Sequence, residues 1–256
     1  MATFPGSSPD TASHHAFRAH EARTLAQRQV RRCPYLFSVA PADFDCGMPT
    51  DLTPPSRPGF PSTHELLDTA WRRYLAAMEH ILTHQPFLLG GRFTLADASA
   101  YGQLGMNLVD GRAAGLLEDF APNTFVWLNR ISDGEDRGSD GELFASERLA
   151  PLLQCIADTF IPLMQQNAIA YEKAKASGQT LFNEAAFDRG EALYDGSLLG
   201  LPFRSVVKSF QVLCWRDVCD QWQALSGNTQ RELSTRFPVL QASLFSQEGA
   251  RQPGDF

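Results

Sequence analysis

The chain has 256 residues, of which 43% are hydrophobic and 11% aromatic, so it is able to bury a substantial core. Its 22 basic and 29 acidic residues give a net charge of −7, which argues against nucleic-acid binding as a general function. No apolar run approaches the roughly 18 residues of a membrane span, and the N-terminus lacks the order of a secretory signal. Because the five cysteines form no repeated close pair, we expect reduced thiols in a cytoplasmic protein with no membrane partner.

The first 32 residues are rich in arginine and poor in acids. Ser13 predicts the cap of a helix over 14–33, whose apolar stripe is incomplete. Transit peptides have such a composition, but a solvent-exposed helix face has it more often. Six prolines then fall between Pro41 and Pro61. Since proline fixes φ and removes a backbone donor, we expect an extended connection here rather than a helix or a strand.

The most regular helical patterns lie in the next 70 residues. Thr63 or Ser62 predicts the cap of a helix over 64–82, and Pro86 follows its end. A further helix is expected over 95–109, and another over 124–131. The apolar residues that recur at helical spacing in the first of these are Leu67, Ala70, Trp71, Tyr74, Leu75, Met78, Ile81 and Leu82.

Thr94 and Asp97 stand at the spacing of a capping box before the 95–109 helix. In this arrangement the threonine side chain accepts the amide proton of the third helical residue, and Asp97 accepts the N–H of the cap residue. If Asp97 is buried, we expect its loss to cost more than the ~1 kcal/mol of a surface cap.

The second half of the chain is less regular. A polar, glycine-broken loop over 132–142 precedes a long helical pattern that starts at 146, with Pro162 inside it as an expected kink. The pattern over 177–202 is ambiguous and fits either a short hairpin or irregular packing. Further helices are expected over 203–225 and 229–236. Because several alternating β-branched segments are nowhere found, we predict an all-α fold.

The run FLLGGRFTLADASAYGQL, followed by APNTFVWLNRI, resembles the C-terminal helical domain of glutathione S-transferases. The resemblance covers 63–131. It implies a helical bundle in which residues 1–62 supply an N-terminal helix and a Pro-rich connection, and residues 132–256 supply a polar loop and a helical extension. Residues 149–215 also resemble the tail of a bacterial subgroup of these proteins, in which an earlier helix carries a His-aromatic-Arg pattern.

The resemblance also suggests substrate-binding residues. In related transferases, the helices that correspond to 14–33, 63–84 and 94–110 line a hydrophobic-substrate pocket. The implied ligand contacts are therefore His15 and Arg18 from the His-aromatic-Arg pattern, together with Trp71, Tyr74 and Tyr101. Packing in the core is the competing explanation for the three aromatic residues.

Glutathione transferases bind glutathione mainly through an N-terminal thioredoxin-like domain, and the first 62 residues here show neither a βαβ pattern nor Cys-x-x-Cys. We therefore expect no glutathione site and no cofactor of its own, with glutathione relevant only if a partner supplies that domain. The protein is expected to bind a hydrophobic small molecule or a protein partner, and it could form a homodimer. Since no nucleophile–base pair is evident, catalysis is left open. The alternatives are an enzyme of divergent specificity on a hydrophobic metabolite and the helical subunit of a split transferase.

Three weaker patterns predict no metal site and no catalytic thiol. His80 and His84 stand four residues apart but lack a third ligand, so solvated histidines are favoured. Residues 136–147 nearly fit a calcium loop, but Gly138 occupies a ligand position. Cys214 and Cys219 lie among aromatic residues, where buried structural thiols are common.

Overall fold

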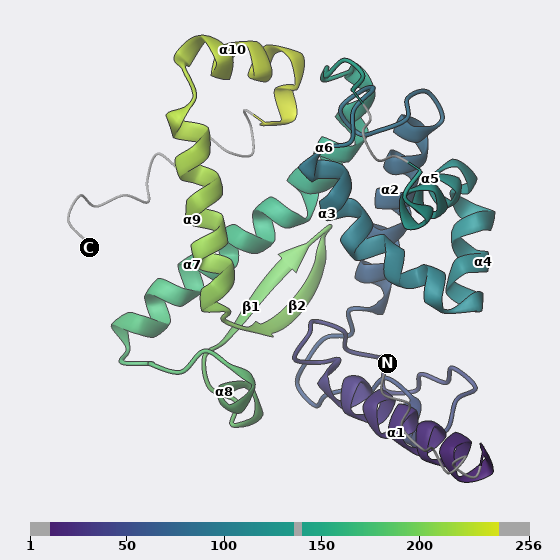
Figure 1. Cartoon of the computed structure of the whole chain (residues 1–256). Helices are drawn as coiled ribbons and strands as arrows, with labels where there is room; N and C mark the ends of the chain where they lie inside the picture. Colours follow the sequence, from purple (N-terminus) through teal and green to yellow (C-terminus); the bar gives the residue numbers. More distant parts are fainter. Residues whose placement is uncertain (1–10, 136–139, 241–256) are drawn as a thin grey trace, which may run out of the picture.

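The computed structural model describes residues 11–135 and 140–240, with side chains described from residue 19 onward, and helices dominate it (Figure 1). The α-helices are α1 (Thr11–Arg32), α2 (His64–Leu82), α3 (Leu95–Leu104), α4 (Gly111–Phe120), α5 (Pro122–Asp133), α6 (Ala150–Asp158), α7 (Phe160–Ala176), α8 (Glu184–Asp188), α9 (Ser209–Ala224) and α10 (Gly227–Arg236). Short 3₁₀ helices are η1 (Thr50–Leu52), η2 (Gly105–Val109) and η3 (Glu147–Leu149). The all-α expectation is confirmed, with one small hairpin as its exception. No helix in the described part of the chain is long and apolar enough to cross a membrane.

The main core lies around α2, which packs against α5 and α6. Met78, Ile81 and Leu128 have no exposed surface, and Trp127 is 1% exposed. Phe237, just after α10, joins the same cluster, so the end of the described extension returns to the bundle. The periodicity of 64–82 therefore predicted the centre of the fold correctly.

Several helical segments differ from the sequence expectation, and the expected helix over 95–109 is α3 only to Leu104 and continues as η2. Helix α4 was missed because Gly111 and Gly115 weaken its pattern, although Asp110 caps it by accepting from the amides of Arg112 and Ala113. The expected long helix after 146 is divided into α6 and α7 at Thr159. The break lies just after Asp158 because Pro162 has no N–H for that carbonyl and its ring would clash with it.

Residues 193–206 form an antiparallel hairpin of β1 (Leu193–Leu198) and β2 (Leu201–Val206). The prediction of helix from 203 was therefore wrong at its start, and α9 begins only at Ser209. Both turn residues, Leu199 and Gly200, have positive φ (52° and 78°). A leucine rarely adopts this conformation, so the turn lacks the Asn-Gly type of signal that identifies tight hairpins in sequences.

The N-terminal segment is anchored by side-chain hydrogen bonds and by packing, since Val39 and Ala40 are buried and Phe37 packs against the cluster of Leu66, Leu198 and Phe203. Between residues 11 and 62 the structure describes α1 and η1 and no strand. Because α1 starts at Thr11, Ser13 stands inside the helix and not at the expected N-cap position. Thr63 is the N-cap residue of α2 by position, but its side chain makes no capping hydrogen bond. Its buried hydroxyl instead accepts from Val39 N (2.9 Å) and donates to Phe37 O (2.8 Å).

A cation–aromatic cluster ties the Pro-rich connection to α8 and the hairpin. Arg57 lies 3.6 Å from the ring centre of Phe187 and donates to its carbonyl (2.8 Å). The same guanidinium lies 4.9 Å from the ring centre of Phe60, and Arg204 of β2 donates to Gly59 O (3.0 Å). The contacts of Arg57 with Phe187 and of Arg204 with Gly59 join residues more than 100 positions apart, so they place the N-terminal segment beside the C-terminal extension.

Candidate functional site

The turn before α3 is organised by a buried carboxylate. Asp97 is completely buried and accepts hydrogen bonds from Leu88 N (2.8 Å), Thr94 N (2.9 Å) and the Thr94 hydroxyl (2.7 Å). Thr94 and Asp97 form a capping box at the start of α3. One side chain thus caps a helix and also holds the preceding turn, which is an architectural role.

The Gly-Gly pair of this turn allows a close approach between two backbones. Gly90 has φ = 100°, and a Cβ there would lie 2.7 Å from both Glu142 O and the Phe144 ring. Gly91 N donates to Glu142 O (2.9 Å), and Phe144 N donates to Leu89 O (3.2 Å). The close contact with the loop after α5 therefore explains the two glycines, and they need no catalytic or ligand-binding role.

A second cap, partly buried and at the start of α5, was missed by sequence reasoning. Ala121 at the N-cap has no hydrogen-bond acceptor in its side chain. Glu79 of α2 supplies the acceptors instead. Its carboxylate accepts from Asn123 N (3.0 Å) and Nδ2 (2.6 Å), and from Thr124 N (2.9 Å) and Oγ1 (3.1 Å). Burial alone would raise the pKa of Glu79, but these hydrogen bonds outweigh it and lower the pKa. The absence of a capping residue before Pro122 was the available signal.

The three aromatic residues expected in a ligand pocket contact different neighbours. Trp71 packs edge-on against Phe120 of α4, with ring centres 6.2 Å apart. Tyr74 lies toward α6, where burial and the nearby Cys155 raise its pKa. Tyr101 lies against Gly105 at the end of α3. All three border the main core, and this arrangement favours packing over one shared ligand site. The side chains of His15 and Arg18 lie outside the described residues.

The weaker metal patterns gain no support from the described residues. The rings of His80 and His84 are 5.9 Å apart, and His84 Nδ1 lies 3.1 Å from the His80 carbonyl. No group of three or more potential metal ligands is found among the described residues. The calcium-like pattern lies partly outside them, since 136–139 are not described. Cys214 and Cys219 are half-buried on α9.

An uncharged surface extends along α3 and η2. From Leu95 to Val109 the only charged residue is the buried Asp97. Leu95, Met106 and Val109 are 82%, 76% and 90% exposed. We call this surface the α3–η2 face, and its exposed residues are Leu95, Ala98, Ser99, Gly102, Gln103, Met106 and Val109. A helix face in water normally carries charged side chains, so this one has the composition of a contact surface.

The chain matches one family model, and the match covers the helices just described. Residues 61–130 match the model of the glutathione S-transferase C-terminal domain. This segment contains α2, α3, α4 and most of α5, with the Thr94–Asp97 capping box. No curated protein and no solved structure matches the chain.

Proposed function

We propose that this protein, whose residues 61–130 match the glutathione S-transferase C-terminal domain, functions by binding a protein partner through the α3–η2 face. We further propose that it has no glutathione site of its own. The observation that carries this proposal is the absence of any exposed charge between Leu95 and Val109, together with three large apolar side chains that are at least 76% exposed. Covering each of these side chains is worth roughly 1.5–3 kcal/mol.

The shape and composition of this surface favour a protein over a small molecule. Small-molecule sites are concave and enclose most of their ligand, whereas the α3–η2 face is the outer side of a helix. Ala98, Ser99 and Gly102 separate its large side chains, so the backbone of a second helix is able to approach closely. Trp71 contacts α4 and Tyr74 lies toward α6, so the two side chains have different neighbours.

The partner to which we commit is a second copy of this chain. Two-fold dimers are the commonest oligomers of soluble proteins, and their interfaces are self-complementary. Two copies of an uncharged face meet without like-charge repulsion. Two charged faces of a protein with net charge −7 would on average repel each other. A thioredoxin-like partner, as in a split transferase, is the competing occupant of the same face.

Self-association is measured by sedimentation velocity of the full chain from low to high micromolar concentration. We expect a dimer for the natural sequence and a monomer for the Met106→Lys/Val109→Lys variant. The matched control is Val126→Lys on α5, which replaces another exposed valine (56%) and should leave the dimer intact. A natural chain that stays monomeric throughout, or a double variant that still dimerises, would contradict the proposal. In the first case, mixing with a thioredoxin-like domain tests the competing occupant.

A further inference from the structure

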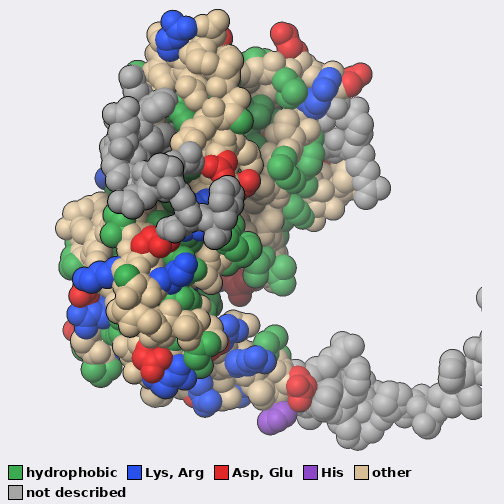
Figure 2. Space-filling view, turned by 90° about the vertical axis from the view of Figure 1, so that its left-hand side faces the viewer, with side chains coloured by type: hydrophobic (Ala, Val, Ile, Leu, Met, Phe, Trp, Pro, Cys, Tyr) green, Lys and Arg blue, Asp and Glu red, His purple; other side chains and the backbone are tan. Residues whose placement is uncertain are grey.

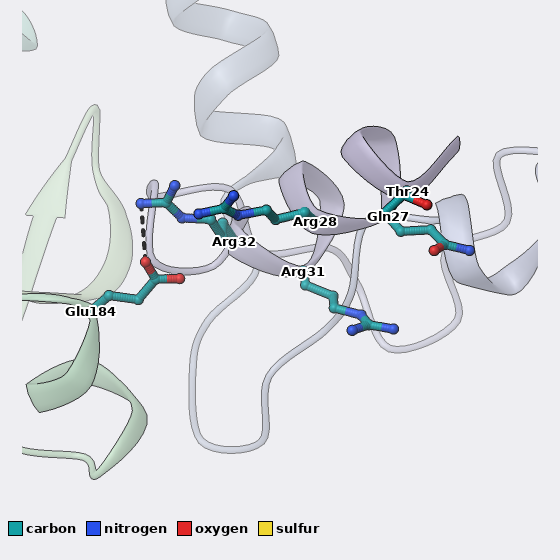
Figure 3. A pocket seen from close by; sticks show the side chains of 6 residues that line it. All are labelled: Thr24, Gln27, Arg28, Arg31, Arg32 and Glu184. Atoms are coloured by element: carbon teal, nitrogen blue, oxygen red, sulfur yellow. Dashed lines mark ion pairs between the residues drawn. The ribbon is translucent and has the colours of Figure 1, made fainter. Parts of the chain in front are cut away.

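A polar groove with a cavity volume of about 400 Å³ lies between α1 and α8, away from the α3–η2 face (Figure 3). Its walls are formed by one face of α1 and by the first residue of α8. The lining residues are Thr24, Gln27, Arg28, Arg31, Arg32 and Glu184. Figure 3 shows the Arg28 and Arg32 side chains running toward the Glu184 carboxylate, whereas the Arg31 side chain points the other way along α1.

Two of these cations have no countercharge within the described structure. Among the described residues, neither Arg28 nor Arg31 has an ion pair or a side-chain hydrogen bond. Arg23 shows that acids are available to this helix, since it pairs with Asp51 at 2.6 Å. Arg28 and Arg31 therefore keep their donors free to bind an anion in the groove.

The third cation is only partly satisfied. Arg32 Nη2 lies 3.0 Å from Glu184 Oε2, but its Nε is buried without a hydrogen-bond partner among the described residues. Guanidinium groups bind oxyanions best through two parallel N–H donors. The Arg32 side chain is 32% exposed overall, so its terminal nitrogens, and not the buried Nε, are the ones open to an anion in the groove.

The surroundings of the groove add further positive charge. The Tyr35 ring lies 5.9 Å from Arg32 and 5.0 Å from the Lys208 ammonium. Lys208 lies outside the lining of the groove, and burial lowers its pKa. Figure 2 shows Lys and Arg side chains gathered along the lower part of the molecule, where α1 lies. This positive region stands out in a chain whose net charge is −7.

We propose that the groove between α1 and α8 binds a small anionic ligand through phosphate or carboxylate groups, recognised by Arg28 and Arg32 on the side of Glu184 and by Arg31 on the other side of the groove. Its volume lies within the usual range for small-molecule sites, roughly 300–1,000 Å³. A small ligand is favoured over a membrane or a nucleic acid because Glu184 lies in the groove and the net negative charge of the chain repels large polyanionic surfaces. The site is independent of the proposed dimer.

Calorimetric titration of the full chain at low salt, with pyrophosphate and with citrate as separate probes, tests this site. We expect the Arg28→Gln/Arg31→Gln variant to bind at least about tenfold more weakly, because charge-assisted hydrogen bonds are lost. The matched control is Arg148→Gln, which removes an exposed arginine from η3 and should change the affinity less than about twofold. Glu184→Gln should tighten binding, because it removes the repelling carboxylate and releases Arg32.

Each outcome of this experiment has a distinct meaning. Binding of pyrophosphate alone assigns a phosphate ligand, binding of citrate alone assigns a carboxylate ligand, and both support the site. The proposal is overturned if neither probe binds, if the double variant binds like the natural chain, or if Glu184→Gln weakens binding. It is also overturned if the protein binds only vesicles that contain phosphatidylserine. Titrating the Met106→Lys/Val109→Lys variant in parallel separates this result from the proposed dimer, since anion binding should persist in a monomer.

Discussion

Replacing Asp97 with alanine is expected to lower the thermal unfolding midpoint by roughly 6–12 °C, which corresponds to about 3 kcal/mol for a chain of this size. The carboxylate is completely buried and accepts three hydrogen bonds, two of them from the backbone amides of Leu88 and Thr94. Alanine would leave both amides without an acceptor in a space that water does not reach. The loss should therefore exceed that of an exposed helix cap.

Asp133→Ala is the matched control for this prediction. Asp133 is exposed and is the last residue of α5, where a negative charge meets the negative end of the helix dipole. Its removal should leave the midpoint nearly unchanged or raise it slightly. Thermal unfolding followed by circular dichroism compares the two variants. Equal shifts would show that the buried hydrogen bonds of Asp97 contribute little to stability.

Glu79→Gln is expected to destabilise the protein at neutral pH by roughly 1–2 kcal/mol, because an amide offers one acceptor atom where the carboxylate offers two. The NH₂ group of the glutamine would face the donors of either Asn123 or Thr124. The start of α5, whose N-cap is an alanine, would lose part of its only side-chain cap.

The difference between Glu79→Gln and the natural chain should depend on pH. The folded-state pKa of Glu79 lies below its ordinary value of 4.5, so its contribution is complete above that value. It is lost as the pH falls through the folded-state pKa, and the two proteins should then converge. Urea unfolding at stepwise lower pH measures this, with exposed Glu118→Gln as the control. A difference that stays constant down to acid pH would contradict the proposed role.

Local patterns in the sequence predicted the centre of the fold, whereas interactions across the chain were not predictable from it. The periodicity around Met78 and the Thr94–Asp97 spacing are encoded within a few residues. The cap supplied by Glu79 joins two helices 44 residues apart, and nothing in either helix alone indicates it.

The same reason explains why the neighbours of the expected site residues were not predictable from the sequence. Trp71 and Tyr74 are three residues apart on one helix, but the neighbours that cover them come from α4 and α6. The groove on α1 depends on Glu184, which lies more than 150 residues from Arg32. The composition of α1 indicated a basic helix face, but only the fold shows which of its arginines are paired and which are free.

This protein is proposed to act by binding a partner and to have no glutathione chemistry of its own. The proposal is tested most directly by incubating the purified protein with glutathione and a chlorinated aromatic substrate. We predict no turnover above the buffer rate and no retention on immobilised glutathione, because the described residues before α2 form a helix and extended segments rather than a thioredoxin-like sheet. Turnover above the buffer rate that is retained through purification would contradict a function based on partner binding alone.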